Sequence, residues 1–161
     1  MSDRDRDESG KARNQRPRDA LGRPLPHGSE GVSRIPDDLT LAPADSLRYA
    51  QELLDRGLAF NAHEVLEAAW KNAPDSERTM WKALAQLAVG VTHTQRGNLA
   101  GAESVLRRAA DGLMSSREVS AHGVDVDGLV AHTQELIADL AQHAEISEQR
   151  LRPRLQAPEL I

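Results

Sequence analysis

The stretch 81–95 reads WKALAQLAVGVTHTQ and decides the fold class. Between Ala83 and Val91, only Gln86 is polar and only Gly90 lacks a side chain. A helix that is apolar around its whole circumference is normally enclosed by neighbouring helices. The stretch therefore predicts a central buried helix, and Gly90 marks a point at which a neighbouring helix can approach closely.

Amphipathic segments on both sides predict further helices around this one. The first is expected to begin near Pro43 and to end at Gly57. The second is expected to run from Asn61, as its N-cap, to Lys71. Because aromatic residues are few, Leu, Ala and Val must form the core, which favours closely packed helices over a β-sandwich.

Capping residues indicate where the remaining helices begin. Asp75 or Ser76 is expected to cap the central helix. Asn98 is expected to cap the fourth helix, and Asp125 or Asp127 the fifth. No alternating strand pattern and no repeated period are evident along the chain. The sequence thus predicts an all-α fold, a compact bundle of about five helices.

The two ends of the chain differ in composition from the helical part. Residues 1–38 combine low hydrophobicity and mixed charge with repeated Gly and Pro, which is typical of a disordered or extended arm. Pro153 and Pro158 favour a loose tail over residues 148–161. The expected organisation is therefore a basic, disordered N-terminal arm, an all-helical domain at 39–147 and a loose C-terminal tail.

The net charge of −5 is unevenly distributed. Residues 1–34 carry eight Lys or Arg and six Asp or Glu, whereas the remainder carries twelve and nineteen. An acidic domain argues against a nucleic-acid surface and leaves the basic stretch 11–23 as the only candidate for one. The chain has no cysteine, which excludes disulfides and thiolate metal sites and fits a cytoplasmic location. No apolar run approaches the roughly 20 residues of a membrane span.

The segment 60–70 reads FNAHEVLEAAW and carries the most informative polar residues. On a helix, Glu67 lies about 40° from His63 and Glu64 about 100° from it, so His63 and Glu67 share a face. The central helix, which is expected to pack against this segment, adds an amide and a second imidazole. The predicted polar cluster comprises His63, Glu64, Glu67, Gln86 and His93.

Three interpretations of this cluster remain open, and one of them is that its members are unrelated surface positions. Buried imidazole, carboxylate and amide groups can pair with one another and fix one register of the helices. Alternatively, His63, Glu67 and His93 bind a divalent metal ion. The zinc motif His-Glu-x-x-His is not supported, because Glu67 stands where the second histidine would be.

Three ordered blocks in the second to fourth predicted helices carry a family resemblance. They are His63-Glu64-x-x-Glu67-x-x-Trp70, Leu84-Ala-Gln86-Leu-Ala-Val and His93-x-x-Arg96-Gly97-Asn98-Leu-x-Gly101-Ala102. Together they resemble the domain-of-unknown-function family 309, small all-helical bacterial and archaeal proteins, and the lead-in 16–26 resembles the arm of actinobacterial members. The resemblance covers about residues 45–115 and implies an all-α fold. It implies no activity, since none is established for the family.

Three functions follow as hypotheses. The first is a non-enzymatic module that acts through self-association or a protein partner, and it is preferred because packing explains every feature except the polar cluster. The second is a metal-dependent hydrolase or small-ligand-binding protein centred on His63, Glu67 and His93. The third is a nucleic-acid-associated protein that acts through the arm. A helical fold alone does not decide among them.

Overall fold

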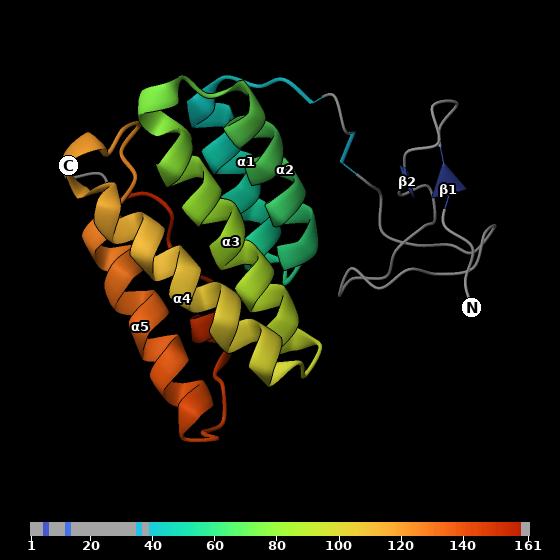
Figure 1. Ribbon diagram of the computed structural model, residues 1–161, viewed down its shortest axis with the longest axis vertical. Coiled ribbons are helices and arrows are strands. Elements are labelled where there is room, and N and C mark those ends of the chain that lie inside the picture. The colour runs from blue at the N-terminus through green and yellow to red at the C-terminus, as the bar shows by residue number, and fades with distance from the viewer. Residues whose placement is uncertain (1–4, 7–11, 14–34, 37–38, 159–161) are drawn as a thin grey trace.

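The computed structural model describes residues 5–6, 12–13, 35–36 and 39–158. Five α-helices make up most of this part of the chain and enclose one core (Figure 1). Their bounds are α1 Pro43–Asp55, α2 Ala59–Asn72, α3 Arg78–Gln95, α4 Leu99–Ser115 and α5 Val126–Ala141. Three 3₁₀ turns accompany them, η1 Asp75–Glu77, η2 Arg117–Val119 and η3 Glu148–Leu151. The predicted all-α bundle of about five helices is confirmed.

The central helix is α3, as the sequence predicts. It packs against α2 on one side and against α4 on the other (Figure 1). Its side chains Trp81, Leu84 and Leu87 are at most 1% exposed. A Cβ atom at Gly90 would stand only 2.4 Å from Cδ2 of Leu106. The absent side chain of Gly90 therefore permits the close approach of α4.

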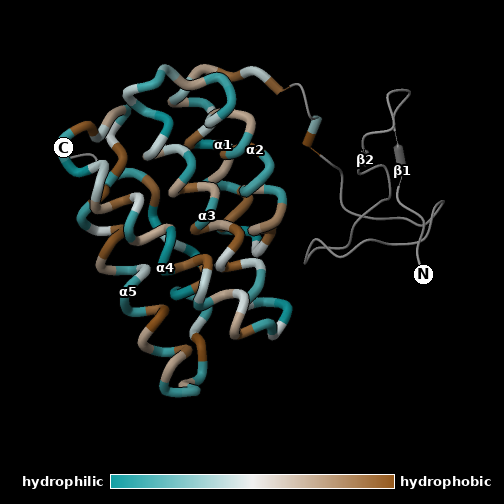
Figure 2. Tube along the Cα trace, viewed as in Figure 1, coloured by the Kyte–Doolittle hydropathy of each residue, from teal (hydrophilic) through white to brown (hydrophobic). Residues whose placement is uncertain are grey.

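The helices around α3 each contribute one side to the shared core, whereas α3 is buried around most of its circumference. Figure 2 shows hydrophobic and hydrophilic residues alternating along the helices, as expected of amphipathic helices that bury one face. None of the helices in the described ranges has both the length and the apolarity that a membrane crossing requires.

The starts of α2 and α3 differ from the prediction. Asn61 is not the N-cap of α2 but lies buried inside that helix, whose N-cap is Leu58. The reason is the turn at Gly57, whose φ of +77° reverses the chain so tightly that α2 begins almost at once. Asp75 and Ser76 do not cap α3, because they form η1, and α3 begins after this extra turn.

The caps of α4 and α5 are as predicted. The Asn98 side chain accepts a hydrogen bond from the main-chain N–H of Gly101 at the start of α4. The Asp125 side chain accepts one from the N–H of Gly128 at the start of α5. Each cap satisfies one of the N–H groups that a helix start leaves without a main-chain partner.

The first four helices form two hairpins with matching turns, 40 residues apart, a similarity that was not predicted from the sequence. Gly57 and Gly97, 40 residues apart, both have φ +77° and hold the same place in the α1–α2 and α3–α4 turns. In each turn, the residue after the glycine donates its N–H to the carbonyl five residues earlier, at 2.8 Å and 2.9 Å. Identical residues recur at this spacing in seven places, namely Leu47/Leu87, Arg56/Arg96, Gly57/Gly97, Ala62/Ala102, Val65/Val105, Leu66/Leu106 and Ala69/Ala109.

The predicted N-terminal arm lies mostly outside the described residues, as does most of its basic stretch 11–23. Described there are two strands of two residues each, β1 Asp5–Arg6 and β2 Ala12–Arg13, which pair antiparallel. Strands this short cannot carry an alternating pattern, so the sequence gives no sign of them. Ile35 is only 4% exposed and belongs to the core, so the domain begins before its predicted start at residue 39.

The chain after α5 is packed against the domain, and the prediction of a loose C-terminal tail is wrong for residues 148–158. We call residues 148–158 the tail; residues 159–161 lie outside the described part. Figure 1 shows the tail running back along α5 towards the start of that helix. Pro153 is buried, and Leu155 is 1% exposed within the hydrophobic core. The tail is thus part of the fold.

Candidate functional site

His63 and Glu67 form a close pair along one face of α2, which is an ion pair when the imidazole is protonated. His63 Nε2 lies 2.8 Å from Glu67 Oε2, and Lys71 Nζ lies 3.4 Å from Oε1 of the same carboxylate. The hydrogen bond from His63 is the main cause that lowers the pKa of Glu67 from 4.5 to about 2, while partial burial opposes it. The charges of His63 and Lys71 lower this pKa further. Glu67 is therefore an anion with both oxygens engaged.

Both ring nitrogens of His63 face acceptors. While Nε2 faces the Glu67 carboxylate, Nδ1 lies 3.3 Å from the main-chain carbonyl of Phe60. The Phe60 ring packs against the imidazole, with 5.3 Å between ring centroids, and the Arg96 guanidinium lies 5.7 Å from the Phe60 centroid. A metal ion needs an imidazole lone pair. Metal binding by His63 would therefore require that one of these two contacts break.

The other members of the predicted cluster, His93, Gln86 and Glu64, do not join the His63–Glu67 pair through any hydrogen bond given for the described residues. Asn98 Nδ2 donates to His93 Nδ1 at 3.2 Å. Burial, and then the nearby charge of Arg96, lowers the pKa of His93, which favours the neutral ring that this acceptor role requires. Gln86 is half-buried, and among the described residues no hydrogen bond joins it to His63 or His93. Glu64 is also half-buried on α2. The structure thus pairs His63 with Glu67 and leaves His93 in a separate contact.

No preformed metal site is found in the described ranges, because no group of three or more His, Cys, Asp or Glu side chains there is arranged to hold an ion. A structural or catalytic metal usually has three or four protein ligands. Metal binding by His63, Glu67 and His93 stays a prediction, and it would require a rearrangement of these side chains.

The tail packs against a surface of the helices that sequence reasoning does not identify. Gln51 of α1 contacts two of its main-chain groups, because Nε2 donates to the Pro153 carbonyl at 3.0 Å and Oε1 accepts from the Leu155 N–H at 2.9 Å. On the α5 side, Asp125 N–H donates to the Leu155 carbonyl, at 3.0 Å. One side chain of α1 and the main chain before α5 thus bind the tail backbone from two elements.

Further main-chain pairing continues this contact towards the end of the tail. Ala157 donates its N–H to the carbonyl of Gly123 at 3.0 Å, and Val124 and Gln156 form an antiparallel bridge. The Gln156 side chain also donates to the carbonyl of His122. After η3, residues 153–157 of the tail are therefore bound as an extended chain, and the hydrogen bonds to their backbone do not depend on their side chains.

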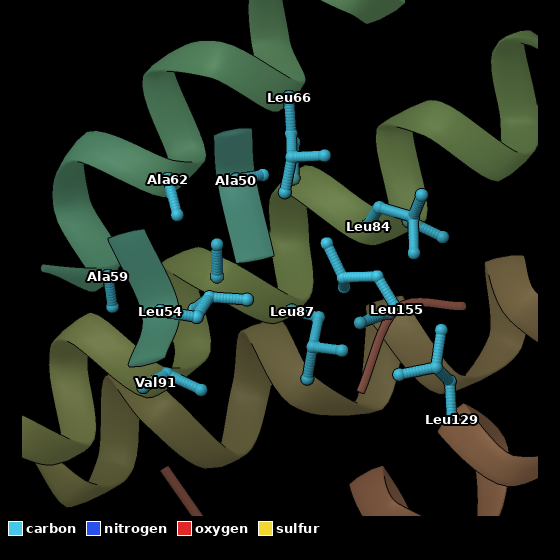
Figure 3. Close-up of a cluster of buried hydrophobic side chains, with 14 of the residues drawn as sticks. Ala50, Leu54, Ala59, Ala62, Leu66, Leu84, Leu87, Val91, Leu129 and Leu155 are labelled. Carbon is cyan, nitrogen blue, oxygen red and sulfur yellow. The ribbon is translucent and has the colours of Figure 1, made fainter. Parts of the chain in front are cut away.

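Between residues 151 and 155, the side chains of the tail alternate between the core and solvent. Pro153 and Leu155 are buried and Leu151 is half-buried, whereas Arg152 and Arg154 are exposed. Leu155 belongs to the same cluster as Leu84, Leu87 and Leu129 (Figure 3). Alternation with a period of two is what an extended chain gives when one edge faces a groove. The groove thus receives the side chains of Leu151, Pro153 and Leu155.

The exposed arginines of the tail face acidic side chains of the helices. Arg154 Nη1 lies 3.1 Å from Asp55 Oδ2 of α1. Arg150 contacts two carboxylates of α5, Glu135 Oε2 at 2.6 Å and Asp139 Oδ2 at 2.8 Å. A hollow of about 560 Å³ lies beside the tail, between it and the start of α5. We call the surface formed by Gln51, Asp55, Gly123–Asp125, Leu129, Glu135 and Asp139 the tail groove.

One sequence signal could have pointed to this groove. Residues 150–155 read RLRPRL, a strict alternation of arginine with an apolar residue. Pro153 and Pro158 suggest a loose end. Proline is nevertheless compatible with an extended strand at a position where no main-chain N–H has to donate a hydrogen bond. Gln51 and Asp55 carry no local signal, because their role depends on a segment about 100 residues away in the chain.

The comparison with known families finds a match for the two hairpins but none for the tail. The model of the family described as a domain of unknown function, DUF309, matches residues 47–105. The predicted family resemblance is confirmed. The DUF309 segment runs from α1 into α4 and holds both glycine turns, the His63–Glu67 pair and Gln51. The tail and α5 lie outside it. No curated protein and no solved structure matches the chain.

Proposed function

We propose that the protein is a non-enzymatic interaction module whose binding site is the tail groove, and that the groove takes an extended peptide segment. One observation carries the proposal: the tail itself lies there as a bound peptide, with Gln51 and Asp125 on its backbone and Leu155 in the core. Extended peptides are commonly recognised in this way, with main-chain hydrogen bonds for affinity and pockets for alternate side chains.

Charge and shape define the peptide class that fits the groove. Its apolar floor accepts a leucine at the position of Leu155, and its acidic rim, Asp55, Glu135 and Asp139, favours cationic residues at the alternate positions. Rim charges act mainly on association rate and specificity, because exposed ion pairs contribute little affinity. The expected partner segment is therefore extended, with alternating basic and apolar residues.

A labelled peptide of residues 148–158 tests the proposal in fluorescence anisotropy with the full-length protein. In the wild type, the tethered tail competes at an effective concentration on the order of millimolar. The peptide should therefore bind the full-length Leu155→Ala variant, whose own tail is weakened, with at least tenfold higher apparent affinity than the wild type. Arg154→Glu, a change at an exposed position of the tail, should give a smaller effect in the same direction.

Two controls separate groove binding from non-specific binding. A peptide that carries Asp in place of Leu155 should not bind, because a charge cannot enter the apolar floor. Gln51→Ala, introduced into the Arg154→Glu protein, should weaken peptide binding without changing the helical circular dichroism signal. If the unmodified peptide shows no saturable binding to either folded tail variant, the groove is only a part of the core and the proposal fails.

The other two hypotheses are tested separately. For a metal site at His63, Glu67 and His93, elemental analysis of purified protein should find near-stoichiometric metal that His63→Ala and His93→Ala remove. The engagement of both His63 ring nitrogens by acceptors speaks for the structural interpretation of the cluster. Nucleic-acid binding through the stretch 11–23 rests on residues that lie mostly outside the described part, and a salt-dependent binding assay would test it.

A further inference from the structure

We infer that the tail groove of one chain accepts the tail of a second copy, so that two chains exchange tails reciprocally and form a dimer. This inference rests on the proposed function, because it names the partner that the groove takes. Tail exchange requires three things: contacts that form equally well between chains, a hinge that can open, and a tail that the groove prefers to other segments.

The contacts of the tail meet the first requirement. Its partners Gln51, Asp55 and Asp125 belong to α1 and to the turn before α5, not to the tail itself. The same hydrogen bonds, ion pairs and burial of Leu155 therefore form whether the tail comes from the same chain or from another. Exchange conserves these contacts, and the balance between monomer and dimer depends on concentration and on the hinge.

The hinge is the segment 142–147, between α5 and η3. All of its residues are exposed except Ile146, which is half-buried. At its start Gln142, His143 and Ala144 donate to carbonyls of α5, and at its end the Ser147 carbonyl accepts from the Arg150 N–H; residues 145 and 146 have no main-chain hydrogen bond to another described residue. Six residues reach about 20 Å when extended, which sets how far an opened hinge can carry the tail from the end of α5.

The hinge also holds a residue in an unfavourable conformation. His143 has φ +53°, a left-handed backbone that residues with a Cβ atom rarely adopt. This turn is needed to send the tail back along its own α5. An extended hinge that carries the tail to a second chain no longer needs it, so exchange relieves the left-handed conformation of His143.

The charges of the groove select the tail of the same protein. Arg150 faces Glu135 and Asp139, and Arg154 faces Asp55, so two tail cations meet three carboxylates of the helices. Every copy of the chain carries both the acidic rim and the basic tail. Two chains are therefore complementary to each other twice, once at each groove, which is the geometry of a closed two-fold dimer.

A pair of charge-reversed full-length variants tests the exchange. The first, Asp55→Lys with Glu135→Lys and Asp139→Lys, reverses the rim, and the second, Arg150→Glu with Arg154→Glu, reverses the tail. Each variant alone repels its own tail. When the two are mixed, both exchanged tails meet a groove of opposite charge, so a 1:1 heterodimer should form that neither variant forms alone, as measured by native mass spectrometry and size-exclusion chromatography with light scattering.

Added salt and a core substitution identify the interface. The heterodimer should weaken when salt is raised, because its selectivity is ionic. Leu155→Ala in the tail-reversed chain should reduce heterodimer formation at least fivefold, because an exchanged tail places Leu155 in the core of the partner. Circular dichroism must show both variants folded; if the multiple variants unfold, the milder pair Asp55→Lys and Arg154→Glu replaces them.

The outcomes separate this inference from the proposed function. If the peptide of residues 148–158 binds but the mixed variants stay monomeric, the groove binds peptides and the exchange is wrong. If a heterodimer forms that Leu155→Ala does not affect, another surface joins the chains, and the exchange is again wrong. If the peptide fails to bind the folded tail variants, the proposed function itself falls.

Discussion

The Glu67 carboxylate is the residue whose ionisation is most closely tied to the fold. Its pKa of about 2 in the folded protein lies below its ordinary value of 4.5. A lowered pKa means that folding favours the ionised form, so the contribution to stability is complete above about pH 4.5 and is lost as the pH falls towards 2. Because the side chain is 38% exposed, solvent screens the ion pair and its contribution is small.

Glu67→Gln should therefore lower the free energy of unfolding at pH 7 by only about 0.5–1 kcal/mol. Below pH 4.5 the stability of the variant should fall less steeply than that of the wild type. Urea unfolding at several pH values between 2 and 7 measures both effects. Glu52→Gln, at an exposed position of α1, is the control and should change neither; parallel curves for wild type and Glu67→Gln would contradict the prediction.

Leu84 and Leu87 are fully buried in the core, with exposures of 0% and 1%. Replacing either with Ala leaves a cavity beneath α2 and α4, because closely packed helices relax only partly around it. Each substitution should lower the free energy of unfolding by about 2–5 kcal/mol, as read from denaturant midpoints. Lys82→Ala, on the exposed side of α3, should have little effect. An unchanged midpoint for both leucine variants would mean that α3 is not the centre of the core.

Single residues also show what helical spacing can and cannot predict. The four-residue spacing of His63 and Glu67 suffices to predict that they share a face, because both lie on one helix. The place of His93 relative to them depends on how α3 rotates and slides against α2, which no spacing within one helix determines. The sequence therefore predicted that His63 and Glu67 would pair, but it could not predict where His93 would lie relative to them.

The two hairpins are the organising elements of the fold. Gly57 and Gly97 have the same φ, and a Cβ atom at either position would meet nothing within 4 Å. A side chain at either position would therefore lower the free energy of unfolding only through the strain of the left-handed backbone, and not through a clash. Gly57→Ala and Gly97→Ala should each lower the free energy of unfolding by about 1–2 kcal/mol, and by nearly the same amount.

Asparagine provides a matched control for these turns, because it adopts the left-handed conformation more readily than alanine. Gly57→Asn and Gly97→Asn should cost less than the alanine variants in the same thermal or urea unfolding experiment. A large difference between positions 57 and 97 would show that the two turns are not equivalent in energy.

The repeat was hard to predict at this scale for a physical reason. The turns require only a left-handed glycine, and the buried faces require only apolar residues of suitable size. Most paired positions of the two hairpins can therefore differ, and only seven of them hold identical residues. The helix ends were predicted where a side chain makes the cap, as at Asn98 and Asp125. They were wrong at α2 and α3, where the N-caps make no side-chain bond.

At the scale of the whole molecule, the tail connects elements that are distant in sequence. Its hydrogen bonds reach α1 through Gln51 and the start of α5 through Asp125. The sequence could not predict this, because the groove exists only after the helices have packed. Its alternation of Arg with Leu or Pro was visible, yet six residues of alternating pattern do not specify which surface they will face.

Leu155→Ala should therefore destabilise the whole domain and not the tail alone. Leu155 is 1% exposed, so a loss of about 2–5 kcal/mol in the free energy of unfolding is expected. Hydrogen exchange should become faster in α1 and α5 as well as in the tail. Leu151→Ala, at a half-buried position, should cost less. If exchange increases only in the tail while the unfolding midpoint is unchanged, the tail is an accessory of an independently stable bundle.

Leu155 stands late in the chain, so the tail groove and the side chain that fills it are synthesised in a fixed order. Translation proceeds from the N-terminus, so all five helices are made before Leu155, which follows the end of α5 by fourteen residues. At a translation rate of about 5–20 residues per second, the last residue of α5 is synthesised about 1–3 s before Leu155. Synthesis therefore always makes the five helices before the residue that fills the core between them, and a chain interrupted before residue 155 would carry every helix without that side chain.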